Sequence, residues 1–257
     1  MPHALNVTRA GLLLLAALAS PLHAADVGVL TPASRHLRII LVAGSPSAFL
    51  GLGVMSAGAA NRGDDLDRWA KRDGYDVSAR LTQQLLAGID RSGHSGIAVA
   101  VTRRSPESTR PIARDELPSA PGADRLLDVT LSYVGLIAKS PTASYEPGFM
   151  VEYRWLGPDG DLMQATRFVV YNHELGAFYR NTRQHDSYAP FVKPYKTDDS
   201  EANPDCGFRT LKAVESDTTK LWSCFDEALA KISDVIARDM PASTRPPGGM
   251  TSERDGN

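Results

Sequence analysis

The chain has 257 residues, of which 42% are hydrophobic and 23% charged, and its formal net charge at pH 7 is −2. This length suits one domain with a full hydrophobic core, or one domain with a long insertion. The near-neutral charge argues against a nucleic-acid-binding protein, which needs a basic face, and against a protein held on membranes by a basic cluster.

Residues 1–25 have the layout of a secretory signal peptide. One basic residue, Arg9, precedes the apolar run Gly11–Ala19, and small residues with a proline follow before the first acid, Asp26. This order is typical of an export signal, and the apolar run is shorter than the about 20 residues that span a bilayer. Cleavage is expected after Ala24 or Ala25, and Ala19 is an alternative cleavage position. We therefore expect a mature protein that is periplasmic or secreted.

The stretch 39–60 (IILVAGSPSAFLGLGVMSAGAA) carries no charge. Its start belongs to the apolar run Arg38–Ala43, which predicts a strand buried on both faces. The stretch is long enough for a membrane helix, but Pro46 and several glycines interrupt it, and it lacks the spacing of a phosphate-binding loop. We expect a strand followed by a compact connection. The alternatives are an apolar lip that docks on a partner or on lipid, and a membrane-associated segment.

The clearest helix of the first half is predicted for Asp76–Asp90. Asp76 is a good N-cap, and apolar residues recur every fourth position on one stripe: Val77, Leu81, Leu85 and Ile89. A strand is expected at Gly96–Arg103, with Ile97, Val99 and Val101 alternating. Residues 104–124 carry prolines and charges, which predicts an exposed loop.

The second half predicts a strand, a hairpin and a long helix. Within 128–136 (DVTLSYVGL), alternation places Val129, Leu131 and Tyr133 on one face. A hairpin is predicted over residues 148–171, around the turn Gly157-Pro158-Asp159-Gly160. A helix from about Asp217 to Met240 has one apolar face, and the tail 241–257 is expected to be disordered.

These elements predict a single α+β domain over residues 26–240, with a mixed sheet of about five strands and two main helices packed on it. The order of an apolar strand, the helix ARLTQQLLAGID, a strand, DRLLDVTLSYVGL and a hairpin resembles the N-terminal domain of TolB and the related envelope proteins LpoB and CsgG. The resemblance covers residues 37–171 and implies a domain of the bacterial cell envelope. It carries over no functional residue, and this chain lacks the lipid-acceptor cysteine of several relatives.

The two cysteines, Cys206 and Cys224, are expected to form a disulfide, because exported proteins fold in an oxidising compartment. In the loop-entropy description, closing a loop of this length contributes about 3 kcal/mol. A metal pair or a catalytic thiol is the weaker alternative. The former needs closer spacing or neighbouring histidines, and the latter needs an activating partner.

Residues 172–205 show no clear period and are rich in aromatic, basic and histidine residues. Aromatic residues and arginine are frequent at the centres of binding sites, and long irregular loops often carry function. The candidate binding residues are Tyr171, Tyr179, Arg180, Tyr188 and Phe191. The alternative is that these aromatic residues pack over the sheet edge and the last helix.

A metal site is the alternative chemistry for the same segment. His173-Glu174 matches the beginning of the zinc-peptidase pattern HExxH, but Ala177 stands where the second histidine is required. A looser ligand set is conceivable: His173, Glu174, His185 and Asp186. His94-Ser95 does not fit a nucleophile elbow, because the pair lies between a predicted helix and a strand.

The sequence therefore predicts an exported, non-catalytic binding or accessory module of the bacterial cell envelope. Its expected partner is an envelope protein or a cell-wall component, recognised by strand addition at a sheet edge or by the 172–195 loop. No cofactor and no nucleic acid are expected. The alternatives are an exported metal-dependent hydrolase that uses the 172–195 loop, and a membrane-associated structural protein held by residues 39–60.

Overall fold

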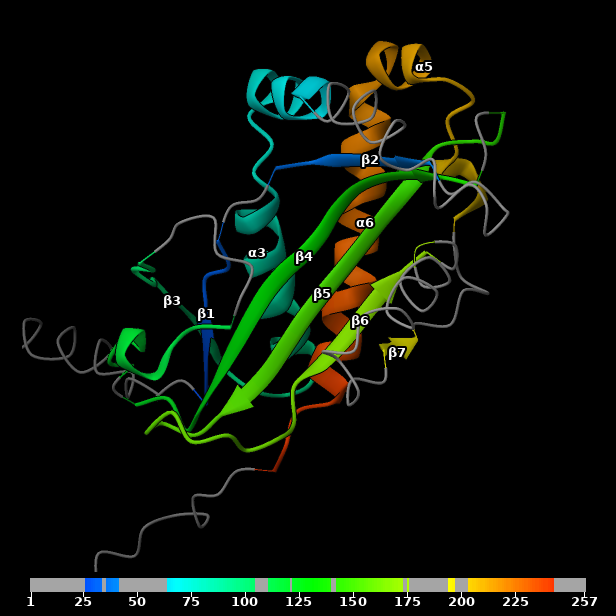
Figure 1. The fold of residues 1–257 in the computed structure, drawn as a ribbon. Helices are drawn as coiled ribbons and strands as arrows, with labels where there is room; N and C mark the ends of the chain where they lie inside the picture. Colours follow the sequence, from blue (N-terminus) through cyan, green and yellow to red (C-terminus); the bar gives the residue numbers. More distant parts are fainter. Residues whose placement is uncertain are drawn as a thin grey trace, which may run out of the picture.

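The structure, a computed structural model, describes residues 26–33, 36–41, 64–104, 111–120, 122–139, 142–172, 175, 194–196 and 203–242. They form an α+β fold in which two long helices lie against one face of a mixed sheet (Figure 1). This confirms the predicted fold class. Among the described residues the sheet has seven strands, in the order β3-β1-β4-β5-β6-β7, and β2 pairs with β4. The two strands that the sequence did not predict are the short β1 and β7.

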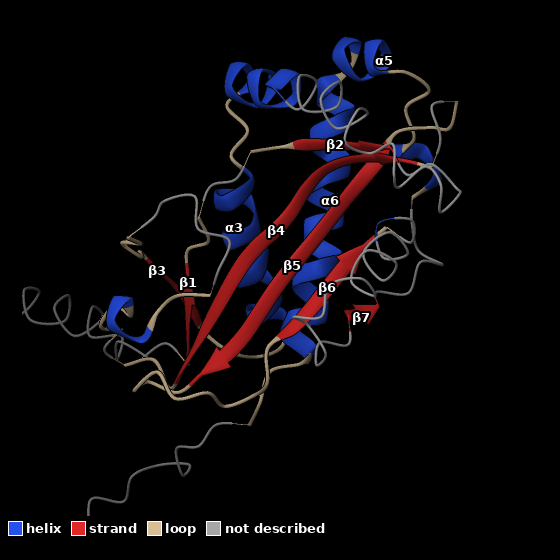
Figure 2. Cartoon of the chain, in the orientation of Figure 1, coloured by secondary structure: helices blue, strands red, loops and turns tan. Residues whose placement is uncertain are grey.

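The strands are β1 (Val27–Leu30), β2 (Arg38–Leu41), β3 (Gly96–Val99), β4 (Arg125–Ala138), β5 (Glu146–Leu156), β6 (Arg167–Tyr171) and β7 (Pro194–Lys196). β1 is parallel to both of its neighbours, β3 and β4, whereas β4, β5 and β6 run antiparallel (Figure 2). The β5–β6 pairing confirms the predicted hairpin. Parallel neighbours need a long crossover connection, and the chain between β1 and β3 includes α3.

The two long helices are α3 (Val77–Arg91) and α6 (Thr218–Arg238), close to the predicted ranges. Asp76 caps α3 as expected, since its carboxylate accepts hydrogen bonds from the backbone N–H groups of Ser78 and Ala79. The helices approach closely at Gly88, where a Cβ atom would lie 3.2 Å from the carbonyl oxygen of Ser233. Shorter helical segments are residues 64–73, α5 (Leu211–Ser216) and the 3₁₀ turns η1 (Arg114–Glu116) and η3 (Pro204–Cys206).

The main core lies between the sheet and these helices, and an aromatic cluster occupies it. Phe225 is fully buried at its centre. Its ring centroid lies 5.0 Å from that of Phe149, 5.5 Å from that of Trp222 and 6.2 Å from that of Tyr75. Tyr75 also stacks on Trp222, and its hydroxyl donates to Asp226. The cluster therefore joins the entry to α3, the start of α6 and strand β5.

A β-bulge in β4 changes which side chains face the helices. The pairing register with β5 shifts between Leu131 and Tyr133, so that one extra residue interrupts the alternation. Leu131 belongs to the helix-side core, whereas Tyr133 packs with Met150 and Phe168 on the opposite face. The prediction that Tyr133 shares a face with Leu131 was therefore wrong, because simple alternation does not include the bulge.

The predicted disulfide between Cys206 and Cys224 is present and ties η3 to the first turns of α6. Both residues are buried. Replacing both cysteines with serine is expected to lower the free energy of unfolding by about 2–4 kcal/mol, because the unfolded chain gains conformational freedom. Urea unfolding monitored by circular dichroism measures this change.

The matched control for the disulfide variant is Ser223→Ala, at an exposed position of the same helical turn. It is expected to change the free energy of unfolding by less than about 0.5 kcal/mol. A double serine variant as stable as this control would show that the disulfide contributes nothing to the folded state.

Candidate functional site

β3 forms one end of the sheet, and no described strand pairs with its outer edge. On its inner edge, the backbone N–H groups of Val27 and Thr31 donate to the carbonyl oxygens of Ser95 and Val99, each at 3.0 Å. Successive residues of a strand direct their backbone groups to opposite edges. The N–H and C=O groups of Gly96 and Ala98 therefore point away from β1. They are the groups that an added strand would bond to.

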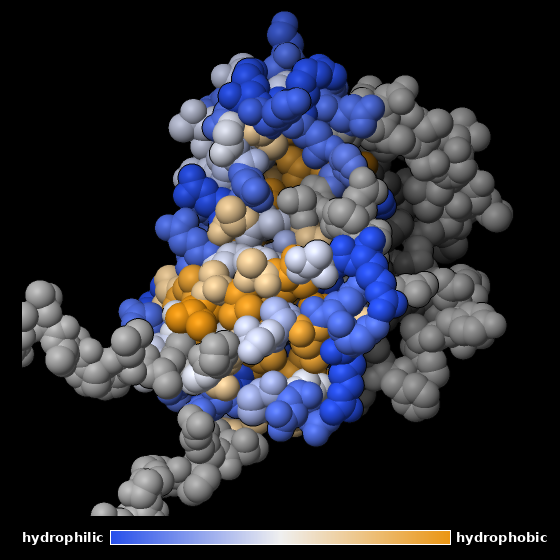
Figure 3. All heavy atoms as spheres, turned by 90° about the vertical axis from the view of Figure 1, so that its left-hand side faces the viewer, coloured by the Kyte–Doolittle hydropathy of each residue, from blue (hydrophilic) through white to orange (hydrophobic). Residues whose placement is uncertain are grey.

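The side chains along this edge are small or apolar. Ile97 is 42% exposed, a large value for an isoleucine, and Ala98 and Ala100 are exposed as well. The run 96–101 contains neither a charged residue nor a proline. In natural edge strands, charged residues or prolines usually prevent pairing with another chain. Figure 3 shows hydrophobic residues gathered on this side of the molecule.

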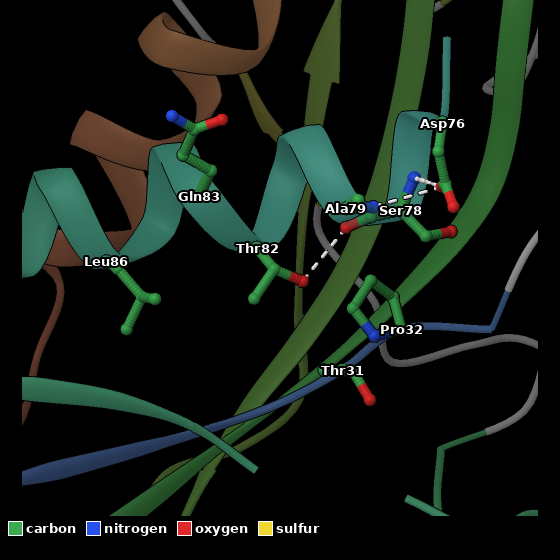
Figure 4. A pocket seen from close by; sticks show the side chains of 8 residues that line it. All are labelled: Thr31, Pro32, Asp76, Ser78, Ala79, Thr82, Gln83 and Leu86. Carbon is green, nitrogen blue, oxygen red and sulfur yellow. Dashed lines mark hydrogen bonds between the residues drawn. The ribbon is translucent and has the colours of Figure 1, made fainter. Parts of the chain in front are cut away.

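An open groove of about 540 Å³ lies beside this edge, between α3 and the segment that follows β1. Its lining comes from these two parts of the chain: Thr31, Pro32, Asp76, Ser78, Ala79, Thr82, Gln83 and Leu86 (Figure 4). The hydroxyls of Ser78 and Thr82 donate to the carbonyl oxygens of Ala33 and Ser78, at 3.1 and 2.9 Å. These two hydroxyls are therefore engaged within the fold, and the groove offers mainly apolar contacts beside the exposed carboxylate of Asp76.

Two hydrogen bonds between Asp26 and Ser95 fix the start of β3 against the start of β1. The backbone N–H of Asp26 donates to the hydroxyl oxygen of Ser95 at 3.1 Å, and the backbone N–H of Ser95 donates to the Asp26 carboxylate at 3.0 Å. That N–H lowers the pKa of Asp26, and His94 lies 3.5 Å from the same carboxylate. In a hydrolytic triad the imidazole bonds to the serine hydroxyl. The hydrogen bond that the structure shows for this hydroxyl is instead with the backbone N–H of Asp26, and it joins the starts of the two strands.

The shifted pKa values in the described part of the chain all move away from neutral pH. The pKa is lowered for the carboxyls of Asp26, Asp73, Glu116 and Glu227. Hydrogen bonds are the main cause in each case, for example those from Arg72 to Asp73. Burial raises the pKa of the hydroxyls of Tyr75, Tyr153 and Tyr171. A general acid or base works best with a pKa near the working pH, and these shifts have the opposite sense.

Of the binding residues that the sequence suggests, Tyr171 lies in the described part of the chain. It is buried at the end of β6, with its ring 6.3 Å from that of Phe149 in an edge-to-face contact. The others, Tyr179, Arg180, Tyr188 and Phe191, lie outside the described residues. Binding by this segment stays a prediction.

The candidate metal ligands also lie outside the described residues: His173, Glu174, His185 and Asp186. Within the described ranges, no group of three or more potential ligands is close enough to hold a metal ion. Of the uncharged stretch 39–60, Ile39–Leu41 belong to β2 and the rest is outside the described residues. No helix in the described ranges is long and apolar enough to cross a membrane.

Sequence reasoning named a sheet edge as a binding surface but did not say which strand forms it. The sequence feature that could have indicated this edge is the uncharged run 96–101, but such a run is equally typical of a central strand. No protein-family model and no curated protein matches this chain. The resemblance to TolB-, LpoB- and CsgG-like domains thus stays an expectation from the order of the elements.

Proposed function

We propose that this chain is an exported, non-catalytic binding or accessory module of the bacterial cell envelope, which recognises an envelope protein or a cell-wall component. The observation that carries the proposal is the outer edge of β3. It combines outward backbone groups at Gly96 and Ala98, an uncharged sequence and an adjacent apolar groove along α3. Such an edge is a template for strand addition, which is a common mode of protein recognition.

Two features support export. A buried disulfide joins Cys206 to Cys224, and such bonds persist mainly in oxidising compartments. The signal-like segment 1–25 ends just before β1, which begins at Val27. Removal of that segment would leave all the described strands of the sheet intact.

A binding role also agrees with the electrostatics of the described residues. The carboxyls with lowered pKa values are engaged in caps, turns and ion pairs, as Glu227 is with Asn203 and Lys231. The tyrosines with raised pKa values are buried, and the hydroxyl groups of Tyr75 and Tyr153 donate hydrogen bonds to carboxylates. These groups stabilise the fold, and their pKa values do not suit proton transfer at neutral pH.

The proposal is tested by site-specific photo-cross-linking in intact cells. A photo-reactive amino acid replaces Ile97 at the outer edge of β3, and in a matched variant it replaces Lys212, an exposed residue of α5 at a distance from β3 (Figure 1). We expect a discrete adduct with one envelope component from position 97 and none from position 212. Mass spectrometry of the adduct identifies the component.

Two results of the cross-linking experiment would contradict the proposal. If neither position yields an adduct while the protein is abundant and exported, the chain does not act through this edge. Equal, diffuse labelling from both positions would show non-specific contact and would also contradict the proposal.

A further inference from the structure

We infer that the occupant of the β3 edge is an extended segment of a partner protein, apolar at its centre and basic at its ends, that joins the sheet as an added strand. The inference rests on the proposed binding function and specifies the chemistry of the partner. Three properties of the edge lead to it: the backbone groups, the side chains on its two faces and the charges at its two ends.

The backbone of the edge is complementary to an extended chain. Gly96 and Ala98 direct their N–H and C=O groups outward, while Ser95 and Val99 bond to the segment that contains β1. An extended segment placed about 4.8 Å away would satisfy these outward groups. A helix satisfies its own backbone groups and would leave these groups to water.

The side chains of the edge favour an apolar centre in the added strand. Ile97 lies opposite Gly28 in the register with β1, on the face of the sheet where Leu30 and Val99 pack. Ala98 lies opposite Val29, on the face that α3 covers. On this second face, Leu86 is only partly buried at the groove. Alternate side chains of an added strand would therefore meet apolar surface on both faces.

Carboxylates lie at both ends of the edge on the side of α3. Asp90, at the end of α3, is exposed, and Asp26 beside Ser95 has a side chain that is 39% exposed. Asp76 is exposed at the other end, where α3 begins next to the groove. Basic groups flanking the apolar part of a partner would be attracted to both ends.

Among the described residues, three basic side chains near the edge are engaged with other carboxylates, and Arg125, whose charge also acts on Asp26, is buried and donates to the carbonyl oxygen of Pro241. Arg91 lies 2.5 Å from Asp234, and Arg104 is ion-paired with Asp115. Arg103 faces the buried Asp128. His94 lies beside Asp26 and adds positive charge only when protonated. The local charge therefore favours a basic partner.

The same acids disfavour a second copy of this chain as the occupant. Antiparallel pairing of two β3 strands about a twofold axis would set the two α3 helices side by side in opposite directions. Asp76 of one copy would then approach Asp90 of the other at both ends of the contact. Like charges placed opposite each other oppose association. A peptide with basic ends meets the same surface without this repulsion.

The probe is a fluorescent ten-residue peptide, Lys-Lys-Thr-Val-Thr-Val-Thr-Val-Lys-Lys, compared with a peptide in which glutamate replaces every lysine. Fluorescence anisotropy with the purified full chain measures both affinities. We expect the basic peptide to bind about tenfold more tightly at low salt, and the difference to shrink at about 1 M salt, where charges are screened beyond ~3 Å. Equal binding of the two peptides would overturn the inference.

Ala98→Pro tests whether the peptide pairs with the edge. Proline removes the outward N–H of residue 98 and keeps the β1–β3 hydrogen bonds, and it is tolerated on strand edges whose N–H faces solvent. We expect about tenfold weaker binding of the basic peptide, whereas the matched Ala98→Thr variant, which keeps the N–H, changes it less than about twofold. Unchanged binding by a folded Ala98→Pro variant would place the peptide elsewhere and overturn the inference.

A second pair of variants keeps the test decisive if Ala98→Pro does not fold. Asp76→Asn and Asp90→Asn preserve size, and asparagine also caps helices well. Together they are expected to remove most of the preference for the basic peptide. A preference that survives both changes would contradict the assigned charge complementarity.

The remaining outcomes separate the inference from the proposed function. An envelope adduct at Ile97 without binding of the basic peptide would leave the proposed function standing and reject this partner chemistry. Analytical ultracentrifugation that shows a dimer, dissociated by Ala98→Pro, would replace the peptide with a second copy. No adduct in cells together with no peptide binding would reject both.

Discussion

Replacing Asp128 with alanine is expected to lower the free energy of unfolding by about 3–5 kcal/mol, because it leaves buried positive charge without its carboxylate. Asp128 is 1% exposed in β4. Its carboxylate accepts from the backbone N–H of Ile112 and from Nε of Arg154, each at 2.9 Å, and lies 3.4 Å from Nη2 of Arg103. The Arg103 side chain is 5% exposed, so water cannot solvate its positive charge once the carboxylate is removed.

Urea unfolding of the variant at neutral pH measures this loss, with Asp128→Asn as the isosteric comparison. Asparagine can still accept the Ile112 N–H but carries no charge, so its cost is expected to be smaller than that of alanine. The variant Arg104→Ala serves as the control, since the Arg104–Asp115 ion pair is exposed and is expected to contribute less than about 1 kcal/mol. If Asp128→Ala is as stable as Arg104→Ala, the buried contacts of Asp128 contribute nothing to stability.

Replacing Phe225 with alanine is expected to cost about 3–5 kcal/mol, since it removes a fully buried ring and leaves a cavity. Phe225 is 0% exposed and makes edge-to-face contacts with Phe149, Trp222 and Tyr75. Its loss loosens the contact of α6 with both β5 and the entry to α3. The same cavity should reduce the near-ultraviolet circular dichroism signal of the remaining rings at temperatures where the backbone stays folded.

The conservative comparison at this position is Phe225→Leu, which keeps an apolar side chain and is expected to cost less than alanine because the cavity is smaller. Stability from urea unfolding should therefore rank native above leucine above alanine. If the alanine variant loses less than about 1 kcal/mol, the ring is not packed as described, since even moderate cavities in a core cost more than this.

The contacts of Asp128 also help to hold the candidate binding edge in place. Asp128 connects β4 to Arg103, just beyond β3, and to Ile112 in the segment that packs over the outer face of the sheet. At the other end, Asp26 and Ser95 join the starts of β1 and β3. β3 is thus fixed at both ends, so a strand added by the proposed partner would meet a template that is already ordered. Such preorganisation reduces the entropy lost on binding.

The elements that the sequence predicted well are those specified by local interactions. The stripe of apolar residues in α3 and its cap at Asp76 follow from contacts within a few residues, and the hairpin of β5 and β6 follows from the turn at Gly157–Gly160. The disulfide followed from the cysteine count together with the predicted export signal. Each depends on spacing along the chain, which sequence patterns report directly.

By itself, the sequence determined the α+β class, the two long helices and the disulfide, because periodicity and cysteine chemistry act over short distances or by counting. Only the tertiary structure decided that β1 lies between β3 and β4, that a bulge turns Tyr133 to the other face and that Asp128 is buried. The physical reason is that strand order and exposure arise from pairing between distant segments. Whether the uncharged run at β3 forms a central strand or, among the described strands, the end of the sheet is a property of its neighbours in space.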